Sequence, residues 1–82
     1  MTHELKVITR FWEDLEAGRK NFELRRNDRH YRVGDTLKLK EFNHDHGFTG
    51  RTLLFDVTYM LLPEDIPGIQ TGWCIMGIKP HG

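Results

Sequence analysis

Apolar and polar residues alternate along several stretches of this chain, which is the pattern of β-strands with one buried face. The alternating stretches are residues 3–8, 21–25, 36–42 and 51–62. A fifth run, residues 73–78, is apolar on both faces and predicts a central strand. Residues 62–72 contain two prolines and two glycines, so no regular structure is expected there.

The alternation also predicts which side chains face the core. In residues 21–25, Phe22 and Leu24 are expected to point inward, while Glu23 and Arg25 share the opposite face. Residues 43–50 are polar and predict a loop. In the long stretch that follows, one face is expected to consist of Leu53, Phe55, Val57, Tyr59 and Leu61.

One stretch has helical spacing instead. Phe11, Trp12 and Leu15 recur on one face, and acidic residues occupy the other. Thr9 is a candidate N-cap, and Gly18 is expected to end the helix in the left-handed conformation that glycine adopts at low cost. A helix this short is unstable alone, so its apolar stripe is expected to pack against the sheet.

The predicted order is a strand, a helix and then four strands, within a chain of 82 residues. We therefore expect an α+β fold, mainly β, in a single domain covering residues 1–82. A small curved sheet or partly open β-barrel, with the N-terminal helix covering one side, agrees with this order. A chain of this length buries only about 60% of its unfolded surface, so its core must be compact. The chain is also too short for a second lobe that closes over a substrate.

Charge and composition narrow the function only slightly. The formal net charge is zero, so any attraction to a polyanion must be local. Cys74 is the only cysteine, which excludes an internal disulfide, and we expect it to be a small core residue. No apolar run approaches the roughly 20 residues that span a bilayer, and we expect a soluble, cytoplasmic protein without a membrane partner.

The strongest local signal is a basic segment between Gly18 and Asp35. Six of the chain's twelve lysine and arginine residues lie in it: Arg19, Lys20, Arg25, Arg26, Arg29 and Arg32. Planar guanidinium groups favour bidentate contact with phosphates and base edges, and Tyr31 and Phe42 are candidate stacking surfaces nearby. The segment therefore predicts binding of an anion or nucleic acid, against the alternative of a solvated surface without a ligand.

Within this segment, Glu23 has two interpretations. It forms a same-face ion pair with Arg25, or it lies among cations on the floor of a pocket and accepts hydrogen bonds from a base or an amide. The sequence His44-Asp45-His46 offers two histidines, but a structural zinc site usually needs four ligands and no further ones lie nearby. We expect a solvated loop there, with neither a metal nor a cofactor.

A longer pattern connects these residues. The motif Gly18-x-Lys20-x-x-Glu23-x-Arg25 is followed by Asp28, Tyr31 and Val33-Gly34-Asp35. Further features are His3-Glu4-Leu5-Lys6, Phe48-Thr49-Gly50-Arg51, Val57-Thr58-Tyr59 and Trp73-x-x-x-Gly77-Ile78. Together they resemble the ASCH domain of the PUA-like superfamily, over nearly the whole chain. Within it, they are most similar to a subgroup of short bacterial and phage proteins known mainly as a domain of unknown function.

The resemblance implies a small β-barrel with a helix beside a cleft, and the GxKxxExR segment lining that cleft. ASCH domains are associated with binding of RNA or nucleotides through their similarity to PUA domains. One branch hydrolyses an acetyl amide on a modified cytidine and has a threonine at the position of Glu23, beside a lysine that matches Lys20. This chain differs from that branch at the threonine.

These observations lead to one prediction and two alternatives. We expect a module that binds RNA or a nucleotide in a basic cleft, through Lys20, Glu23, Arg25, Arg29 and Tyr31. The first alternative is a small amidohydrolase acting on a modified nucleoside, with Lys20 and Glu23 as its catalytic pair. The second is an accessory domain of phage type that binds another protein through the same arginines.

Overall fold

The computed structural model describes all 82 residues and contains one helix and five strands. Their order along the chain is β1 (Thr2–Ile8), α1 (Thr9–Glu16), β2 (Phe22–Arg26), β3 (Thr36–Asn43), β4 (Gly47–Leu61) and β5 (Trp73–Pro80). The predicted order of a strand, a helix and four strands is confirmed. The structure contains no helix with the length and apolar character needed to cross a membrane.

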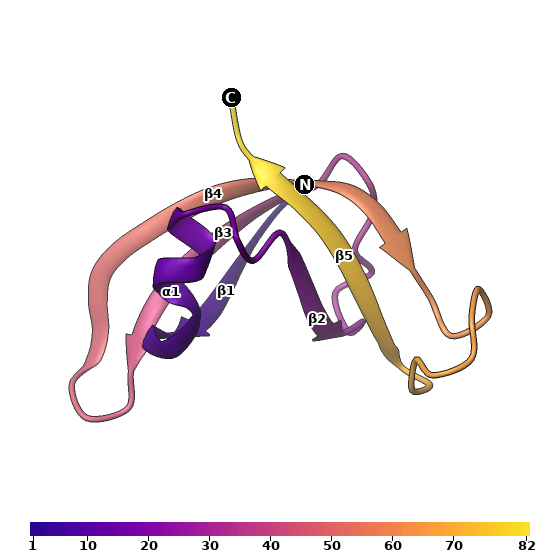
Figure 1. Cartoon of the computed structure of the whole chain (residues 1–82), viewed down its shortest axis with the longest axis horizontal. Coiled ribbons are helices and arrows are strands. Elements are labelled where there is room, and N and C mark those ends of the chain that lie inside the picture. Colours follow the sequence, from indigo (N-terminus) through magenta and orange to yellow (C-terminus); the bar gives the residue numbers. More distant parts are fainter.

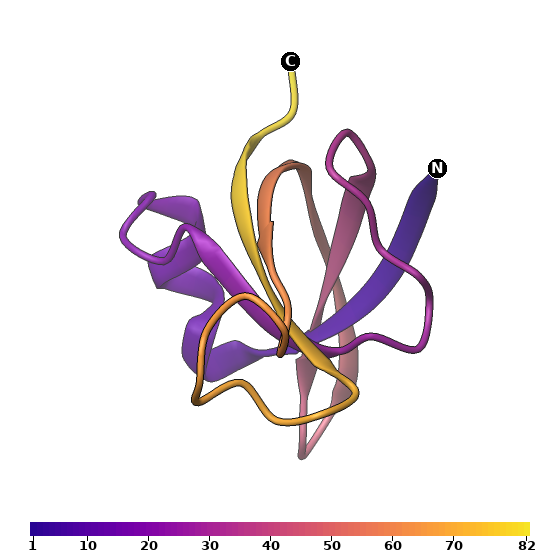
Figure 2. The ribbon, with the colours of Figure 1, turned by 90° about the vertical axis from the view of Figure 1, so that its right-hand side faces the viewer.

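The five strands form one sheet in the order β1-β3-β4-β5-β2. The β1–β3 pair is parallel, and the other three pairs are antiparallel. The long strand β4 arches over the molecule and belongs to both sides of the sheet (Figure 1). The sheet curls into a half-barrel whose two edge strands, β1 and β2, lie on opposite sides of the view in Figure 2. The predicted class, a mainly β α+β fold with a partly open barrel, is confirmed.

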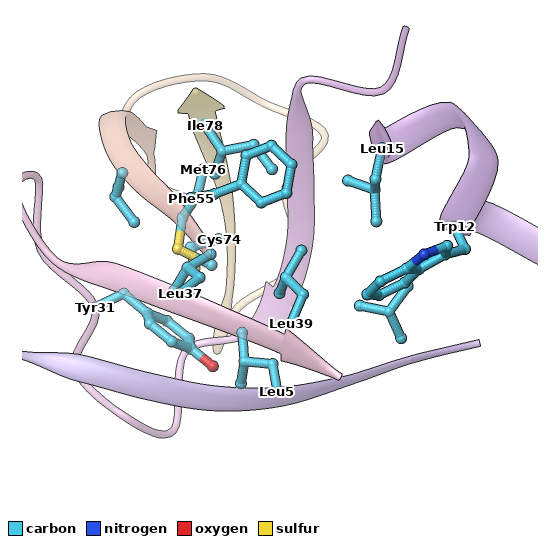
Figure 3. Close-up of a cluster of buried hydrophobic side chains, with 12 residues drawn as sticks. Leu5, Trp12, Leu15, Tyr31, Leu37, Leu39, Phe55, Cys74, Met76 and Ile78 are labelled. Atoms are coloured by element: carbon cyan, nitrogen blue, oxygen red, sulfur yellow. The ribbon is translucent and has the colours of Figure 1, made fainter. Parts of the chain in front are cut away.

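The core lies on the concave face of this sheet. Its buried apolar side chains come from all the strands except β2, together with Trp12 and Leu15 of α1 and Tyr31 of the β2–β3 connection. Figure 3 shows Trp12 and Leu15 at one end of the cluster and Tyr31 beside Leu5 at the other. Cys74 is fully buried among them, as predicted. The helix therefore closes one end of the half-barrel, and Tyr31 lies toward the other end.

The ends of α1 follow the prediction only in part. Gly18 adopts a φ of 77°, the left-handed conformation expected after the last turn. The prediction that Thr9 caps the helix is wrong, because Ile8 occupies the N-cap position and no side chain caps it. Strand β1 runs directly into the helix, and the Thr9 hydroxyl instead donates a hydrogen bond to the Phe42 carbonyl, 3.4 Å away.

The loop expected at residues 43–50 is shorter than predicted. Strand β4 begins at Gly47, and the Asn43 side-chain oxygen accepts hydrogen bonds from the N–H groups of Asp45 and His46. This local acceptor favours a tight turn over an extended loop. Farther along β4, the prediction for Tyr59 is wrong: a register shift between Val57 and Tyr59 moves it out of phase, and it is 64% exposed.

Candidate functional site

A cleft lies along the open side of the half-barrel, where residues of the edge strands β1 and β2 line it together. It has a volume of about 680 Å³, and more than half of its lining residues are apolar. We call it the seam cleft. Its lining residues are Leu5, Lys6, Val7, Ile8, Phe11, Lys20, Phe22, Glu23, Leu24, Arg25, Arg26, Asp28, Arg29, Tyr31 and Trp73.

The prediction that Phe22 and Leu24 face the core is wrong. Phe22 is 46% exposed and Leu24 is 55% exposed, whereas Glu23 is only 4% exposed. The cause is the pairing of β2 with β5, in which Glu23 lies opposite Met76, a fully buried residue of the concave face. Alternation separates two faces but does not say which one packs, and in this edge strand it is the charged face that turns inward.

Glu23 is held by two cations. The Lys20 ammonium lies 2.5 Å from one of its carboxylate oxygens, and Arg25 Nε lies 2.9 Å from the other. Lys20 also donates to the Phe22 carbonyl and lies about 5 Å from the centre of the Phe22 ring. A buried carboxylate is tolerated when it is paired and hydrogen-bonded in this way. The carboxylate thus fixes the positions of both cations at the cleft.

Two arginines also bridge the open side of the barrel. Arg25 donates from Nη2 to the carbonyl of Lys6 at 2.8 Å, and Arg29 donates from Nη1 to the carbonyl of Glu4 at 2.8 Å. Both carbonyls belong to β1, whose other side pairs with β3. The backbone groups of an edge strand have no partner in their own sheet. The guanidinium groups therefore take the place of a sixth strand along part of this edge.

These contacts leave donors free for a ligand. An arginine carries five N–H donors and a lysine carries three. The hydrogen bonds described above use two donors of Arg25, one of Arg29 and two of Lys20. The three cations are thus held in place by the protein and retain N–H groups for an anion or a carbonyl oxygen, which lowers the cost of ordering them on binding.

Tyr31 supplies the hydroxyl group of the cleft. Its ring is buried and packs edge-on against His3, with 4.8 Å between the ring centroids, and its backbone N–H is held by the Asn27 side chain. Burial raises the pKa of Tyr31, and the nearby Arg29 and Arg25 charges oppose this shift. The hydroxyl makes no hydrogen bond to another protein group and points toward β1 in Figure 3. It is therefore available to a ligand.

The cleft therefore brings together all five predicted binding residues, namely Lys20, Glu23, Arg25, Arg29 and Tyr31. Phe42, which was considered for stacking, does not line it. The sequence interpretation missed Arg26, Trp73 and the carbonyls of β1. Arg26 lies 5.3 Å from the Trp73 ring, and its charge is not paired with a carboxylate. The adjacent arginines gave some signal for it, whereas the contribution of β1 depends on how the sheet curls.

The other candidate chemistry lies outside the cleft. The structure brings no three metal-binding side chains together, and His44 packs edge-on against Phe42. Burial raises the pKa of the Cys74 thiol, which favours the protonated form and makes it a poor nucleophile.

The fold and the site together define a small β half-barrel with a basic, apolar-walled cleft at its open side. The chain belongs to the family described as Domain of unknown function (DUF3850), whose model matches residues 2–78. A search of curated proteins gives no match to the chain.

Proposed function

We propose that this protein binds a nucleotide, or a nucleotide unit of single-stranded RNA, in the seam cleft. The observation that carries the proposal is the composition of the cleft. It combines apolar walls with five cationic side chains, against two carboxylates. The apolar walls are suited to a base, and the cations are suited to its phosphate. The volume of about 680 Å³ is that of a site for a small ligand.

The positions of the groups support a division of roles. Lys20, Arg25 and Arg29 retain N–H donors for phosphate or for the carbonyl groups of a base. The side chains of Arg26 and Lys6, which also line the cleft, have no hydrogen-bonded partner. The exposed Leu24 offers an apolar contact to the base. The resemblance to the ASCH domain supports the same proposal, because that domain is associated with RNA and nucleotide binding.

The hydrolase alternative has less support from the site. Acyl transfer needs an activated nucleophile, and the cleft is lined by no serine, threonine or cysteine. Glu23 stands where the hydrolase-like branch has a threonine, and both of its oxygens accept hydrogen bonds. Incubating the wild type and Glu23→Thr with an acetylated cytidine tests this alternative directly. Release of acetate by the wild type would replace our proposal with the hydrolase.

The emission of Trp73 provides a test of binding. Trp73 lines the cleft, whereas the only other tryptophan, Trp12 of α1, is buried in the core and does not line it. Titration with the four 5′-mononucleotides should change the tryptophan emission to saturation, and the Trp73→Phe variant should lose most of that response. If no nucleotide changes the emission and calorimetry detects binding neither of a nucleotide nor of a short RNA, the proposal is wrong.

Salt dependence tests the phosphate contact. Arg25 and Arg29 are poor probes because their loss also frees the carbonyls of β1. Arg26→Gln is cleaner, and Arg32→Gln is its control, since Arg32 is exposed and does not line the cleft. With a short labelled RNA, Arg26→Gln should reduce the slope of log affinity against log salt by about 0.7, the value of one phosphate contact on a single strand. If the salt slopes of Arg26→Gln and Arg32→Gln are equal, Arg26 does not contact a phosphate.

A further inference from the structure

A second group of cationic and aromatic side chains lies on the outer face of the sheet, beside the seam cleft. We call it the outer patch, and it consists of Lys6 of β1, Lys40 and Phe42 of β3, and Phe48 of β4. The Lys6 ammonium lies 4.5 Å from the centre of the Phe42 ring, and the Lys40 ammonium lies 4.9 Å from that of Phe48. The two rings meet edge to face with their centroids 5.1 Å apart.

Strand pairing places these residues in two neighbouring rows across the sheet, because Phe42 lies two residues beyond Lys40 in β3. Lys6 lies opposite Lys40 in the β1–β3 pair, and Phe42 lies opposite Phe48 in the β3–β4 pair. Neighbouring strands are about 4.8 Å apart, so the patch extends about 10 Å from the edge of the sheet, from β1 to β4. Its nearest member to the edge, Lys6, also lines the seam cleft, and its carbonyl is the acceptor of Arg25. The cleft and the outer patch are therefore continuous across β1.

Contacts within the protein leave part of the patch accessible to a ligand. Phe48 is 56% exposed despite its contacts with Phe42 and Lys40. Lys6 makes no ion pair, and the Lys40 ammonium has a carboxylate partner only at 3.5 Å, in the exposed Glu4. The patch thus has one exposed ring, Phe48, and one half-buried ring, Phe42, beside two lysines. These are the components of a surface for single-stranded nucleic acid, because bases stack on aromatic rings and ammonium groups attract the backbone.

We propose that the outer patch holds the nucleotides that flank the one in the cleft, so that the ligand is single-stranded RNA and not a free nucleotide. This inference rests on the proposed function of the cleft. A single strand leaving the cleft over β1 would meet Lys6 first, then the Phe42 and Phe48 rings with Lys40 beside them. The patch offers two aromatic rings, so we expect it to hold about two nucleotides by stacking. An acidic peptide would use the same lysines but would gain little from the exposed ring of Phe48.

The test compares a labelled random-sequence RNA octamer with the four 5′-mononucleotides, at the same ionic strength. The octamer should bind the wild type at least tenfold more tightly than any mononucleotide. Phe48→Ala should weaken octamer binding on the order of tenfold, the effect of losing one base–aromatic stack, and should leave mononucleotide binding unchanged. Tyr59→Ala is the matched control, since it removes another exposed aromatic ring of β4 outside both sites.

The remaining outcomes separate the two proposals. If mononucleotides bind and Phe48→Ala has no effect on the octamer, the outer patch is not part of the site, although the function of the cleft stands. A different result is that the octamer binds, mononucleotides do not, and a cleft variant such as Arg26→Gln leaves octamer affinity unchanged. In that case the proposal for the cleft is wrong, and so is the proposal of a continuous site. Displacement of the octamer from the wild type and from Phe48→Ala alike by polyglutamate would indicate attraction by charge alone and would overturn the stacking role of Phe48.

Discussion

Two glutamates are buried on the concave face of the sheet, and each is paired with an arginine, yet their surroundings differ. Glu41 lies in the closed part of the barrel, where one oxygen accepts from Thr49 and Arg51 Nε and the other from Arg51 Nη2, all at 2.7–2.8 Å. Glu23 lies at the open side, where its two oxygens are bound by two different cations. Both carboxylates are almost inaccessible to solvent.

The two glutamates differ in the further contacts of their cationic partners. Arg51 donates two hydrogen bonds to Glu41 and also lies over the Trp12 ring of the helix. These contacts connect β3, β4 and α1. The partners of Glu23, in contrast, line the seam cleft. Burial of a carboxylate is therefore no guide to function by itself. The informative observation is whether the free donors of its partners face a cavity that can hold a ligand.

The largest effect on stability is expected from Glu41→Gln. The change removes a fully buried charge from a bidentate pair and leaves Arg51 with a poorer acceptor. The melting temperature should fall on the order of 10 °C, with nucleotide affinity of the folded protein unchanged. Thermal unfolding followed by circular dichroism gives the first value, and Glu64→Gln is an exposed control. A variant of Glu41 that keeps its stability but loses ligand binding would reverse the assignment of the two glutamates.

The pH dependence of stability should reflect the same pair. The hydrogen bond from Arg51 holds the pKa of Glu41 below its ordinary value of 4.5, although burial opposes this. The group therefore contributes stability that is fully present above about pH 4.5 and is lost as the pH falls toward the lower folded-state pKa. The difference in melting temperature between wild type and Glu41→Gln should thus be large at neutral pH and shrink in acid. A difference that is constant with pH would mean that the charge of Glu41 is not what stabilises the fold.

Glu23→Gln should have a smaller effect on stability and a larger one on binding. Sequence alternation placed Glu23 off the core face, but its burial between Lys20 and Arg25 means that its loss also destabilises the fold. We expect the melting temperature to fall by about 5 °C, because both cations are near enough to solvent to be rehydrated. Nucleotide affinity should fall at least tenfold, since Lys20 and Arg25 then lose the charge that orients them and each keeps only its bond to a backbone carbonyl. Unchanged affinity in a folded variant would show that Glu23 only stabilises the fold.

The smallest of these effects is expected from Arg29→Ala. The substitution frees one carbonyl of β1, that of Glu4, which solvent can then reach. The melting temperature should fall by less than about 3 °C. Amide hydrogen exchange in β1 is the more sensitive measurement, with Arg32→Ala as the control. Exchange in β1 that is the same in both variants would mean that the arginine does not support this edge.

Much of the fold could be predicted from the sequence because its signals are local. Alternation located four strands, and the run that is apolar on both faces located the fifth. Helical spacing located Trp12 and Leu15 in the core, and the GxKxxExR motif located Lys20, Glu23 and Arg25, which line the cleft. His3 and Glu41 share the alternating phase of the buried residues in their strands, so their burial could have been read from the same pattern. Polar residues at core positions are uncommon, so the alternation alone favours apolar residues there.

Other features could not be predicted because they depend on how distant segments meet. The inward face of β2 is set by its pairing with β5, a strand about fifty residues later in the chain. The bulge that turns Tyr59 outward has no clear local signal, since apolar residues continue on both sides of it. The hydrogen bonds from Arg25 and Arg29 to β1 form only because the sheet curls and brings its two edge strands, β1 and β2, near each other.

The arginine bonds along β1 have a further consequence for the behaviour of the protein at high concentration. An uncovered edge strand is a template on which a second chain can add its own strand, and this is a common route to aggregation. In this protein the carbonyls of Glu4 and Lys6 already accept hydrogen bonds, and a guanidinium charge lies against each of them. An incoming strand would have to displace both charged groups before it could pair. The arginines that border the cleft thus also protect the chain against joining its neighbours edge to edge.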